Sequence, residues 1–241
     1  MRTDGRAWNA VRSPKITRGF PSNAPGSVLI EAGKTVVLCT ASWTEQVPGW
    51  MVGSGKGWVT AEYSMLPGST PQRKQRDGRS GRPDGRSVEI QRLIGRSLRA
   101  GIDLAALPEI SLWVDCDVLS ADGGTRTWAI TGAWVALYDA LGELQKTKGM
   151  RQLPIHQWIC ATSVGMVQGS PLLDLCYEED SNADVDMNVV YTSKGEFAEV
   201  QMSGEKTTLG RQGLDSLLDL AEEGCKHLLQ IQEQVLETPL R

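Results

Sequence analysis

A short run of glycine, threonine and arginine is the strongest candidate for chemistry in this sequence. Gly123-Gly124-Thr125-Arg126 follows an apolar segment typical of a strand and precedes one typical of a helix. Glycines let backbone N–H groups turn toward a ligand, and a helix N-terminus favours anions. A threonine hydroxyl and a guanidinium fork would complete a cradle of phosphate size. The alternative is a tight strand–helix turn whose arginine pairs with a nearby carboxylate. The spacing of a P-loop is absent.

Three aspartates form a second candidate. Asp180, Asp184 and Asp186 lie in a polar stretch that enters an apolar segment. If Asp184 and Asp186 both lie in a strand, its period of two puts them on one face. Clustered carboxylates repel one another unless a cation is bound, and their oxygens, with waters and phosphates, suit Mg²⁺. Exposed acids at a strand end are the alternative. The spacing of an EF-hand is absent.

Positive charge gathers in one window, although the whole chain has a net charge of −4. Nine cations face three carboxylates there, Asp77, Asp84 and Glu89. The cations are Arg73, Lys74, Arg76, Arg79, Arg82, Arg86, Arg92, Arg96 and Arg99. Such a patch on an acidic body suits a polyanionic ligand bound at one place. A solvated loop that binds nothing is the alternative.

Several other classes of protein are disfavoured. No apolar run approaches the ~20 residues of a membrane helix, and the charged N-terminus lacks the apolar core of a signal peptide. The five cysteines show no C-x-x-C spacing, which predicts buried thiols and a cytoplasmic protein. The two histidines, His156 and His227, have no metal-ligand spacing and are expected to be structural. No G-x-S-x-G elbow of a serine hydrolase occurs.

The elements that must position these residues follow from the apolar pattern. In the first half, strands are expected at 15–17, 27–31, 35–40, 58–63 and 111–119, with helices from Ser87 and over 128–145. Residues 67–85, rich in Gly, Pro, Ser and Arg, predict a mobile loop. The helix that Ser87 would cap has a predicted apolar inner face, which consists of Ile90, Leu93, Ile94, Ser97 and Leu98. Arg92, Arg96 and Arg99 would share a different, outward stripe.

The second half repeats this outline. Strands are expected at 158–167, 172–177, 185–191 and 197–202, followed by a helix over 213–232. The sequence therefore predicts an α+β fold, in which two similar halves of sheet and helix, about 1–150 and 151–241, pack as one domain of residues 1–241.

Taken together, these segments resemble the ribonuclease PH family over nearly the whole chain. The matching stretches are Met1-Arg2-Thr3-Asp4-Gly5-Arg6, Gly57-Trp58-Val59-Thr60-Ala61-Glu62-Tyr63, Glu89-Ile90-Gln91-Arg92-Leu93-Ile94-Gly95-Arg96, Val114-Asp115-Cys116-Asp117-Val118-Leu119, Ala121-Asp122-Gly123-Gly124-Thr125-Arg126-Thr127 and Asp184-Val185-Asp186-Met187-Asn188-Val189-Val190. The basic loop departs from the family pattern, as does Met202-Ser203, where the family usually has Gly-Thr.

The resemblance implies an activity and a set of site residues. The activity would be Mg²⁺-dependent phosphorolysis of tRNA precursors and other RNAs from the 3′ end, releasing nucleoside diphosphates. Inorganic phosphate, the co-substrate, would bind Arg86, Gly124, Thr125 and Arg126. Asp180 and Asp186 would act in catalysis with Arg126 and hold the metal, with Asp184 nearby. RNA would be guided by arginines of the basic loop and of the following helix, namely Arg73, Arg76, Arg79, Arg92, Arg96 and Arg99. The assembly would be a homohexamer, a trimer of dimers.

Two rival functions remain at this stage. One is an inert ring subunit that only binds RNA or serves as a scaffold, and the other is a hydrolytic magnesium nuclease. The presence of both the arginine cradle and the acid cluster argues against the first. A hydrolase would need a site for water but no phosphate cradle.

Overall fold

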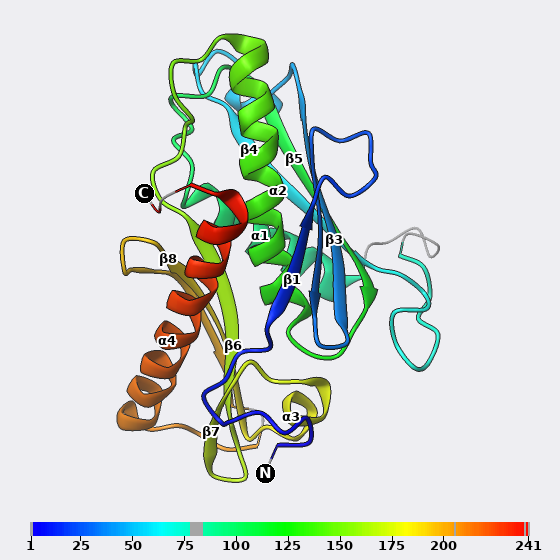
Figure 1. Ribbon diagram of the computed structural model, residues 1–241, viewed down its shortest axis with the longest axis vertical. Helices are drawn as coiled ribbons and strands as arrows, with labels where there is room; N and C mark the ends of the chain where they lie inside the picture. The colour runs from blue at the N-terminus through cyan, green and yellow to red at the C-terminus, as the bar shows by residue number, and fades with distance from the viewer. Residues whose placement is uncertain (1, 78–83, 205, 239, 241) are drawn as a thin grey trace.

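The structure, a computed structural model, describes residues 2–77, 84–204, 206–238 and 240. The N-terminal half forms a five-stranded sheet in the order β1-β2-β3-β5-β4 (Figure 1). Its strands are β1 (Pro14–Arg18), β2 (Gly26–Ala32), β3 (Thr35–Thr44), β4 (Trp58–Met65) and β5 (Ser111–Ser120). Among these paired strands, β4 and β5 run parallel, because helix α1 (Gly85–Arg99) lies in the crossover between them, and the other pairs are antiparallel.

The strands of this sheet follow from alternating residue types. In β3, Val37, Cys39 and Ala41 are buried, whereas the residues between them are only partly covered. The turn to β3 passes through Gly33 at a φ of 58°, a left-handed conformation that glycine adopts without steric cost. Every strand expected in this half is confirmed, each as part of a longer strand.

Helix α1 begins earlier than the sequence indicates. The expected cap, Ser87, is wrong: Asp84 caps the helix, and its carboxylate accepts a hydrogen bond from the N–H of Arg86 at 3.3 Å. Ser87 is instead buried in the first turn and donates to the carboxylate of Asp77 at 2.8 Å. The predicted inner face is confirmed, since all five of its residues are buried. Residues 66–77, before the helix, contain neither helix nor strand.

Helix α2 (Thr125–Lys148) lies at the centre of the molecule (Figure 1). It contacts β2, β3 and β5 of the first sheet and β6 of the second. Its buried residues are distributed around the whole helix and include Trp128 and Trp134. A helix that is apolar on all sides is expected in the interior of a protein. The helix therefore joins the two halves and begins at the glycine turn.

The C-terminal half forms an antiparallel sheet in the order β7-β6-β8-β9. The elements are β6 (Ile159–Val167), β7 (Ser170–Leu173), α3 (Tyr177–Asn182), β8 (Val185–Thr192), β9 (Phe197–Ser203) and α4 (Arg211–Leu236). Three of the expected strands and the last helix are confirmed. The strand expected at 172–177 exists as β7, but its bounds are wrong, because β7 begins at Ser170 and ends at Leu173 and the short helix α3 begins at Tyr177.

The apolar core is continuous across both halves. One cluster of buried side chains includes Ile30 and Trp134 from the first half and Trp158, Tyr191 and Cys225 from the second. The five cysteines are free and buried, as expected. The α+β fold of two sheet-and-helix halves is confirmed, and the assignment of residues 1–241 to a single domain stays a prediction. Among the described residues, no helix combines the length and apolarity needed to cross a membrane.

Candidate active site

The glycine turn between β5 and α2 has the geometry of an anion-binding turn. Gly123 and Gly124 have φ values of 74° and 64°, a region that residues with a side chain rarely adopt. A Cβ on Gly123 would lie 2.5 Å from the carbonyl oxygen of Leu175, so space as well as φ requires glycine there. Gly124 is the N-cap residue of α2 and has no side chain with which to cap the helix. The first N–H groups of α2 are therefore suited to bind an anion.

The predicted phosphate-binding side chains gather beside this turn around a buried tyrosine. The hydroxyl groups of Tyr63, on β4, and Thr125 lie 2.8 Å apart. Burial raises the pKa of Tyr63, while the positive charges of Arg86 and Arg126 oppose that rise. Both guanidinium groups are thus close enough to act on the Tyr63 hydroxyl. Arg86 extends from the first turn of α1 and is exposed, so strands and helices of the first half bring three predicted ligands together.

Arg126 also reaches the second half of the molecule. It donates a hydrogen bond to the side-chain oxygen of Gln201, on β9, at 3.1 Å. Gln201 in turn donates to the carboxylate of Glu89, on α1, at 2.8 Å, and Glu89 lies 3.6 Å from Arg126. The carboxylate foreseen in the alternative interpretation therefore exists. Glu89 is half exposed, and an ion pair at this distance and exposure stabilises little.

Asp186 lies on the face of the second sheet that meets Arg126. In the β8–β9 pair, Asp186 is opposite Ser203 and Asn188 is opposite Gln201. Opposed residues of an antiparallel pair project to the same side, as do residues two apart in a strand. Asp186 and Gln201 therefore share one face, which contacts α1 and the start of α2. Asp184 lies in a bend just before β8, so only Asp186 is in the strand itself.

Asp180 comes from α3, an element that the sequence pattern does not predict. It lies on an exposed part of this helix, directly after the buried Glu179. Within the described residues, no three His, Cys, Asp or Glu side chains are grouped closely enough to bind a metal ion. A site at Asp180 and Asp186 would have two carboxylates only. That number fits Mg²⁺, which commonly binds one or two carboxylates and completes its shell with waters and substrate phosphates.

A buried arginine, which no local sequence pattern indicates, connects the two sides of this site. Arg12 donates to both carboxylate oxygens of the buried Asp174, at 2.8 and 2.6 Å. The same guanidinium donates to the carbonyl of Asp122, next to the glycine turn, at 2.8 Å. Burial lowers the pKa of Arg12, but the hydrogen bonds and charge of Asp174 more than offset this and leave the pKa raised. We call Arg12 and Asp174 the arginine clamp.

A second buried pair holds α3 itself. Arg2 donates to both oxygens of Glu179, at 2.7 and 2.6 Å, and to the carbonyls of Leu173 and Asp174. Burial alone would raise the pKa of Glu179, but the hydrogen bonds from Arg2 and from the N–H of Cys176 lower it. The N-terminal segment therefore fixes both the helix that carries Asp180 and the turn that would hold phosphate.

The predicted RNA-binding arginines differ in their surroundings. Arg73, Arg76 and Arg92 are exposed, and Arg79 lies outside the described residues. Arg76 is near Asp117, whose pKa is raised by burial and lowered in part by the charge of Arg76. Arg96 is exposed and forms a 2.6 Å ion pair with Glu199.

Arg99 departs from the outward stripe that the sequence predicts. Its side chain is half-buried rather than exposed. The guanidinium carbon lies 4.4 Å from the ring centre of Trp58, and one of its nitrogens donates to the carbonyl of Val59 at 2.9 Å. The helix ends at Arg99, where the long side chain can fold back against the edge strand β4. The stripe therefore consists of Arg92 and Arg96 alone.

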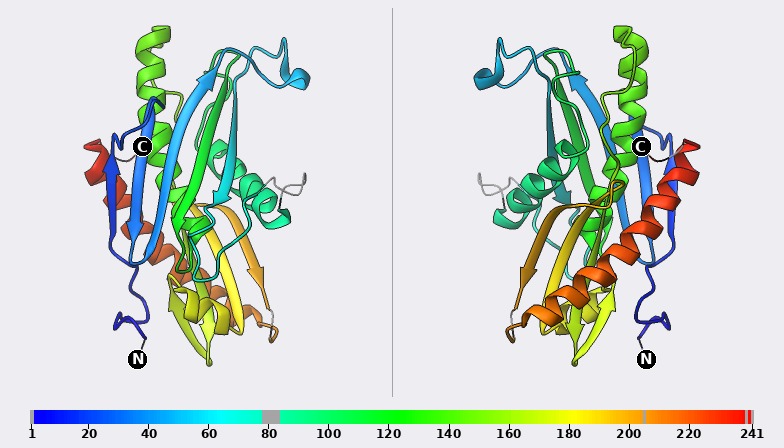
Figure 2. Two further views of the ribbon diagram at one scale, coloured as in Figure 1. Left: turned by 90° about the vertical axis from the view of Figure 1, so that its right-hand side faces the viewer. Right: turned by 90° about the vertical axis from the view of Figure 1, so that its left-hand side faces the viewer.

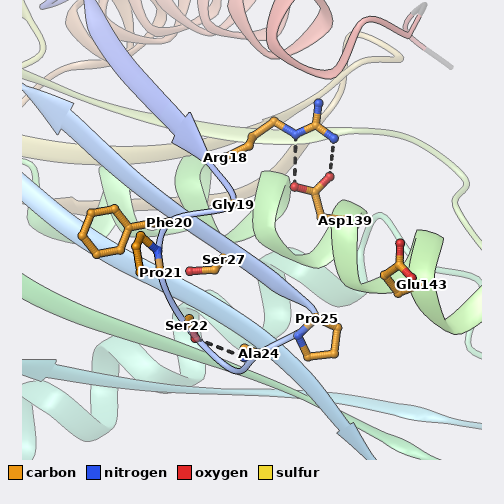
Figure 3. A pocket seen from close by; sticks show the side chains of 10 residues that line it. All are labelled: Arg18, Gly19, Phe20, Pro21, Ser22, Ala24, Pro25, Ser27, Asp139 and Glu143. Carbon is orange, nitrogen blue, oxygen red and sulfur yellow. Dashed lines mark hydrogen bonds and ion pairs between the residues drawn. The ribbon is translucent and has the colours of Figure 1, made fainter.

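A pocket of about 480 Å³ lies elsewhere, between the β1–β2 loop and α2 (Figure 3). Its wall includes the ion pair of Arg18 and Asp139, whose atoms are 2.6 Å apart. Asp139 is fourteen residues after Thr125, or ~20 Å along α2 at 1.5 Å per residue. None of the predicted site residues lines this pocket. The candidate active site is instead the surface where the start of α2 meets β8, β9 and α1.

Comparison with known proteins identifies the family. Residues 10–141 match the 3′ exoribonuclease family, domain 1, and residues 157–224 match domain 2 of that family. The chain is 54% identical over 235 residues to "Ribonuclease PH" of Corynebacterium efficiens, a match that covers 98% of this chain and 96% of that protein.

Solved structures share the fold at lower identity. Rice (Oryza sativa) Rrp46 has a TM-score of 0.81 at 18% identity, with 98% of this chain and 100% of that chain covered. The Archaeoglobus fulgidus exosome with RNA bound to the active site has a TM-score of 0.77 at 22% identity, with 95% and 91% covered. Both family domains are matched, and the resemblance seen in the sequence is confirmed. This chain belongs to the 3′ exoribonuclease family of ribonuclease PH.

Proposed function

We propose that this phosphorolytic 3′→5′ exoribonuclease binds inorganic phosphate through Arg86, Gly124, Thr125 and Arg126, and Mg²⁺ through Asp180 and Asp186. Its RNA substrates would be tRNA precursors and other RNAs with a single-stranded 3′ end. It would act in the cytoplasm as a homohexamer. Membership of the ribonuclease PH family supports the activity, the use of phosphate and the processing of tRNA.

The chemistry follows from what these groups can do. Two guanidinium groups and a helix N-terminus would offset the repulsion between phosphate and the terminal phosphodiester of RNA, and so hold the two anions together. A phosphate oxygen attacks the phosphorus of the last linkage, and the bond from that phosphorus to the 3′ oxygen of the preceding nucleotide breaks. The products are a nucleoside 5′-diphosphate and an RNA one nucleotide shorter. One phosphate linkage replaces another, so the step is reversible.

The metal would stabilise the 3′ oxygen that leaves during the reaction. When bound by Asp180 and Asp186, Mg²⁺ supplies a Lewis acid that stabilises negative charge in the transition state. The shared face of Asp186 and Gln201, with Gln201 bonded to Arg126, is the observation that carries this assignment. Through the Gln201 side chain, the sheet face that carries Asp186 is connected to Arg126 of the proposed phosphate site. No base-specific contact is required, because contacts to the RNA backbone supply most of the binding.

The homohexamer is supported by the family and by the exposed surface. On the edge strand β9, Val200 and Met202 are each 42% exposed and lie on one face. Apolar side chains at a sheet edge are suited to contact another protein surface. Size-exclusion chromatography with multi-angle light scattering, run on the purified protein, should give a single species with six times the monomer mass. A monomer at micromolar concentration would contradict this part of the proposal.

The activity is tested by identifying the released nucleotide. The protein is incubated with Mg²⁺ and a single-stranded RNA, with and without inorganic phosphate, and the products are separated by chromatography. Nucleoside diphosphates that form only with phosphate are expected. Nucleoside monophosphates released at the same rate without phosphate would show hydrolysis, and RNA binding with no release in either condition would show an inert subunit.

A further inference from the structure

One tryptophan is held away from the core by a well-anchored loop. Trp50 lies in the 3-10 turn η1 (Gly49–Met51), between β3 and β4, and its side chain is 71% exposed. The next residue, Met51, is buried, and its N–H donates to the carbonyl of Pro48 at 2.7 Å. Farther along, the N–H of Gly55 donates to the carboxylate of Glu109 at 2.7 Å. The backbone on either side is thus fixed, and it keeps the indole of Trp50 in solvent.

A ladder of rings and cations connects Trp50 to the end of α1. The rings of Trp50 and Trp58 meet edge to face, with centres 4.9 Å apart. The guanidinium of Arg99 lies over the Trp58 ring, 4.4 Å from its centre. Burial lowers the pKa of Arg99, and the neighbouring charge of Arg96 lowers it further, so both cations are close together. An exposed aromatic ring beside arginines is the combination that binds single-stranded RNA, because bases stack on the ring and cations attract phosphates.

The ladder lies at one end of a path that begins at the candidate active site. Arg86 and Arg99 are thirteen residues apart on α1, or ~20 Å at 1.5 Å per residue. A stacked strand of RNA with a rise of ~3.4 Å would cover this distance in about six nucleotides, and an extended one in fewer. Arg92 and Arg96 are exposed along the way. The Trp50 loop and α1 project from the same side of the molecule (Figure 2).

The local charge favours a polyanion such as RNA over a basic or neutral partner surface. Lys56 is exposed in the same loop. Glu45, the nearest acidic residue before Trp50 in the sequence, is paired with Lys148 at 2.7 Å. Glu109 accepts the hydrogen bond from the N–H of Gly55. Arg99 therefore contacts the ladder, Arg96 is close to Arg99 and is paired with Glu199, and Lys56 adds an exposed positive charge to the Trp50 loop, although the chain as a whole is acidic.

We propose that Trp50 is a stacking platform for a base of the single-stranded RNA tail, several nucleotides upstream of the bond that is cleaved. This inference rests on the proposed function, since it places the RNA end at Arg126. The platform would retain tails that are long enough to reach it and would not affect shorter ones. It adds affinity without reading sequence, because every base has a face that can stack.

The test uses RNA length and two matched variants. Phosphorolysis of a tetra-adenylate and a dodeca-adenylate is measured for the wild type, Trp50→Ala, Trp50→Phe and Val52→Ala. Val52 is 70% exposed in the same loop but has no ring, so it controls for the loss of apolar surface. Trp50→Ala should lower kcat/KM for the dodecamer by about 5- to 150-fold, the factor that corresponds to ~1–3 kcal/mol for one stacked base. The tetramer should react at the wild-type rate, and Trp50→Phe and Val52→Ala should retain most activity on both.

Other outcomes would overturn the platform. Equal losses on both RNAs, or a loss in Val52→Ala as large as that in Trp50→Ala, would show that the indole has no role in binding long tails. If the Trp50→Ala protein formed a smaller oligomer than the wild type, as measured by multi-angle light scattering, Trp50 would instead contact another subunit. Wild-type protein that releases no nucleoside diphosphate from either RNA would contradict the proposed function itself, and the platform would fall with it.

Discussion

At the scale of single residues, the groups proposed to bind phosphate and those proposed to bind metal come from different elements. Thr125 and Arg126 begin α2, whereas Asp186 projects from β8, and Gln201 is the side chain that relates them. Glu89 lies 3.6 Å from Arg126. It competes with phosphate for this arginine, because an anion that binds Arg126 must tolerate or displace the carboxylate. Arg126→Ala should therefore weaken the binding of phosphate, whereas Glu89→Ala should not.

Arg126→Ala should raise the KM for phosphate at least tenfold and lower kcat by ~10²-fold, because one preorganised cation is removed from the reacting anion. Its affinity for tRNA should stay near that of the wild type. Glu89→Ala is the matched control, since it removes the partner of Arg126 and retains the arginine. It should leave the KM for phosphate unchanged or lower it. Steady-state kinetics across phosphate concentrations measure both, and an Arg126→Ala enzyme with the wild-type KM would contradict the cradle.

Asp186→Asn keeps the shape of the side chain and removes its charge. If this carboxylate holds Mg²⁺, turnover should fall by at least ~10²-fold while RNA still binds. Excess Mg²⁺ should restore part of the turnover, because a weakened site can be filled by mass action. Single-turnover assays over a range of Mg²⁺ concentrations, with RNA binding measured by anisotropy, test this. Near-normal activity would identify Asp186 as an ordinary residue of an exposed strand end.

At the scale of elements, the arginine clamp fixes the distance between the glycine turn and the segment that leads to α3. Arg12 contacts Asp174 on one side and the carbonyl of Asp122 on the other. Removing one partner of a buried ion pair leaves a charge without compensation, which costs about 3–5 kcal/mol. Asp174→Asn should lower the free energy of unfolding by that amount in a urea titration. Arg211→Lys, at an exposed pair with Asp215, should change it by less than ~1 kcal/mol.

The variant Arg12→Lys tests whether Arg12 positions the two sides of the active site or only stabilises the fold. Lysine keeps the charge but cannot donate to the carboxylate and to the carbonyl of Asp122 in the geometry of a guanidinium. We expect a folded enzyme with a lower kcat and a shifted dependence on both phosphate and Mg²⁺, because the two sides of the site are no longer held together. An Arg12→Lys enzyme with wild-type kinetics would show that the clamp serves stability alone.

The elements also show how far the sequence can predict the fold. Strands and helices with a clear apolar period are predicted correctly, because burial of one face decides their structure. Only residues 172 and 173 of the expected strand 172–177 belong to β7, since Asp174 adopts a φ of 52°, binds Arg12 through its carboxylate, and is followed by the short helix α3. The clamp joins residues 162 positions apart, and no local pattern records such a contact. The aspartates and the glycine turn can be identified from the sequence, because the residue types and their local spacing are sufficient to recognise them.

At the scale of the whole molecule, binding of tRNA and chemistry should be separable. Arg73 and Arg76 are exposed in the loop before α1, and Arg79 belongs to the same basic window. Replacing all three with alanine should weaken tRNA binding and reduce its salt dependence by about 0.7–0.9 log units for each RNA phosphate that the protein no longer neutralises. Phosphorolysis of a tetranucleotide should continue at the wild-type rate. Dissociation constants across a salt series test this, and a triple variant that binds tRNA normally would contradict an RNA-binding loop.

The central claim is that inorganic phosphate, held by Arg86, Thr125 and Arg126, is the nucleophile. The most direct measurement supplies phosphate labelled with ¹⁸O to the wild type, with unlabelled RNA and Mg²⁺, and examines the released nucleotides by mass spectrometry. We predict nucleoside diphosphates that carry the label in the β-phosphoryl group, together with a large decrease in labelled product for Arg126→Ala. Unlabelled nucleoside monophosphates as the main product would contradict the account, because water would then be the nucleophile.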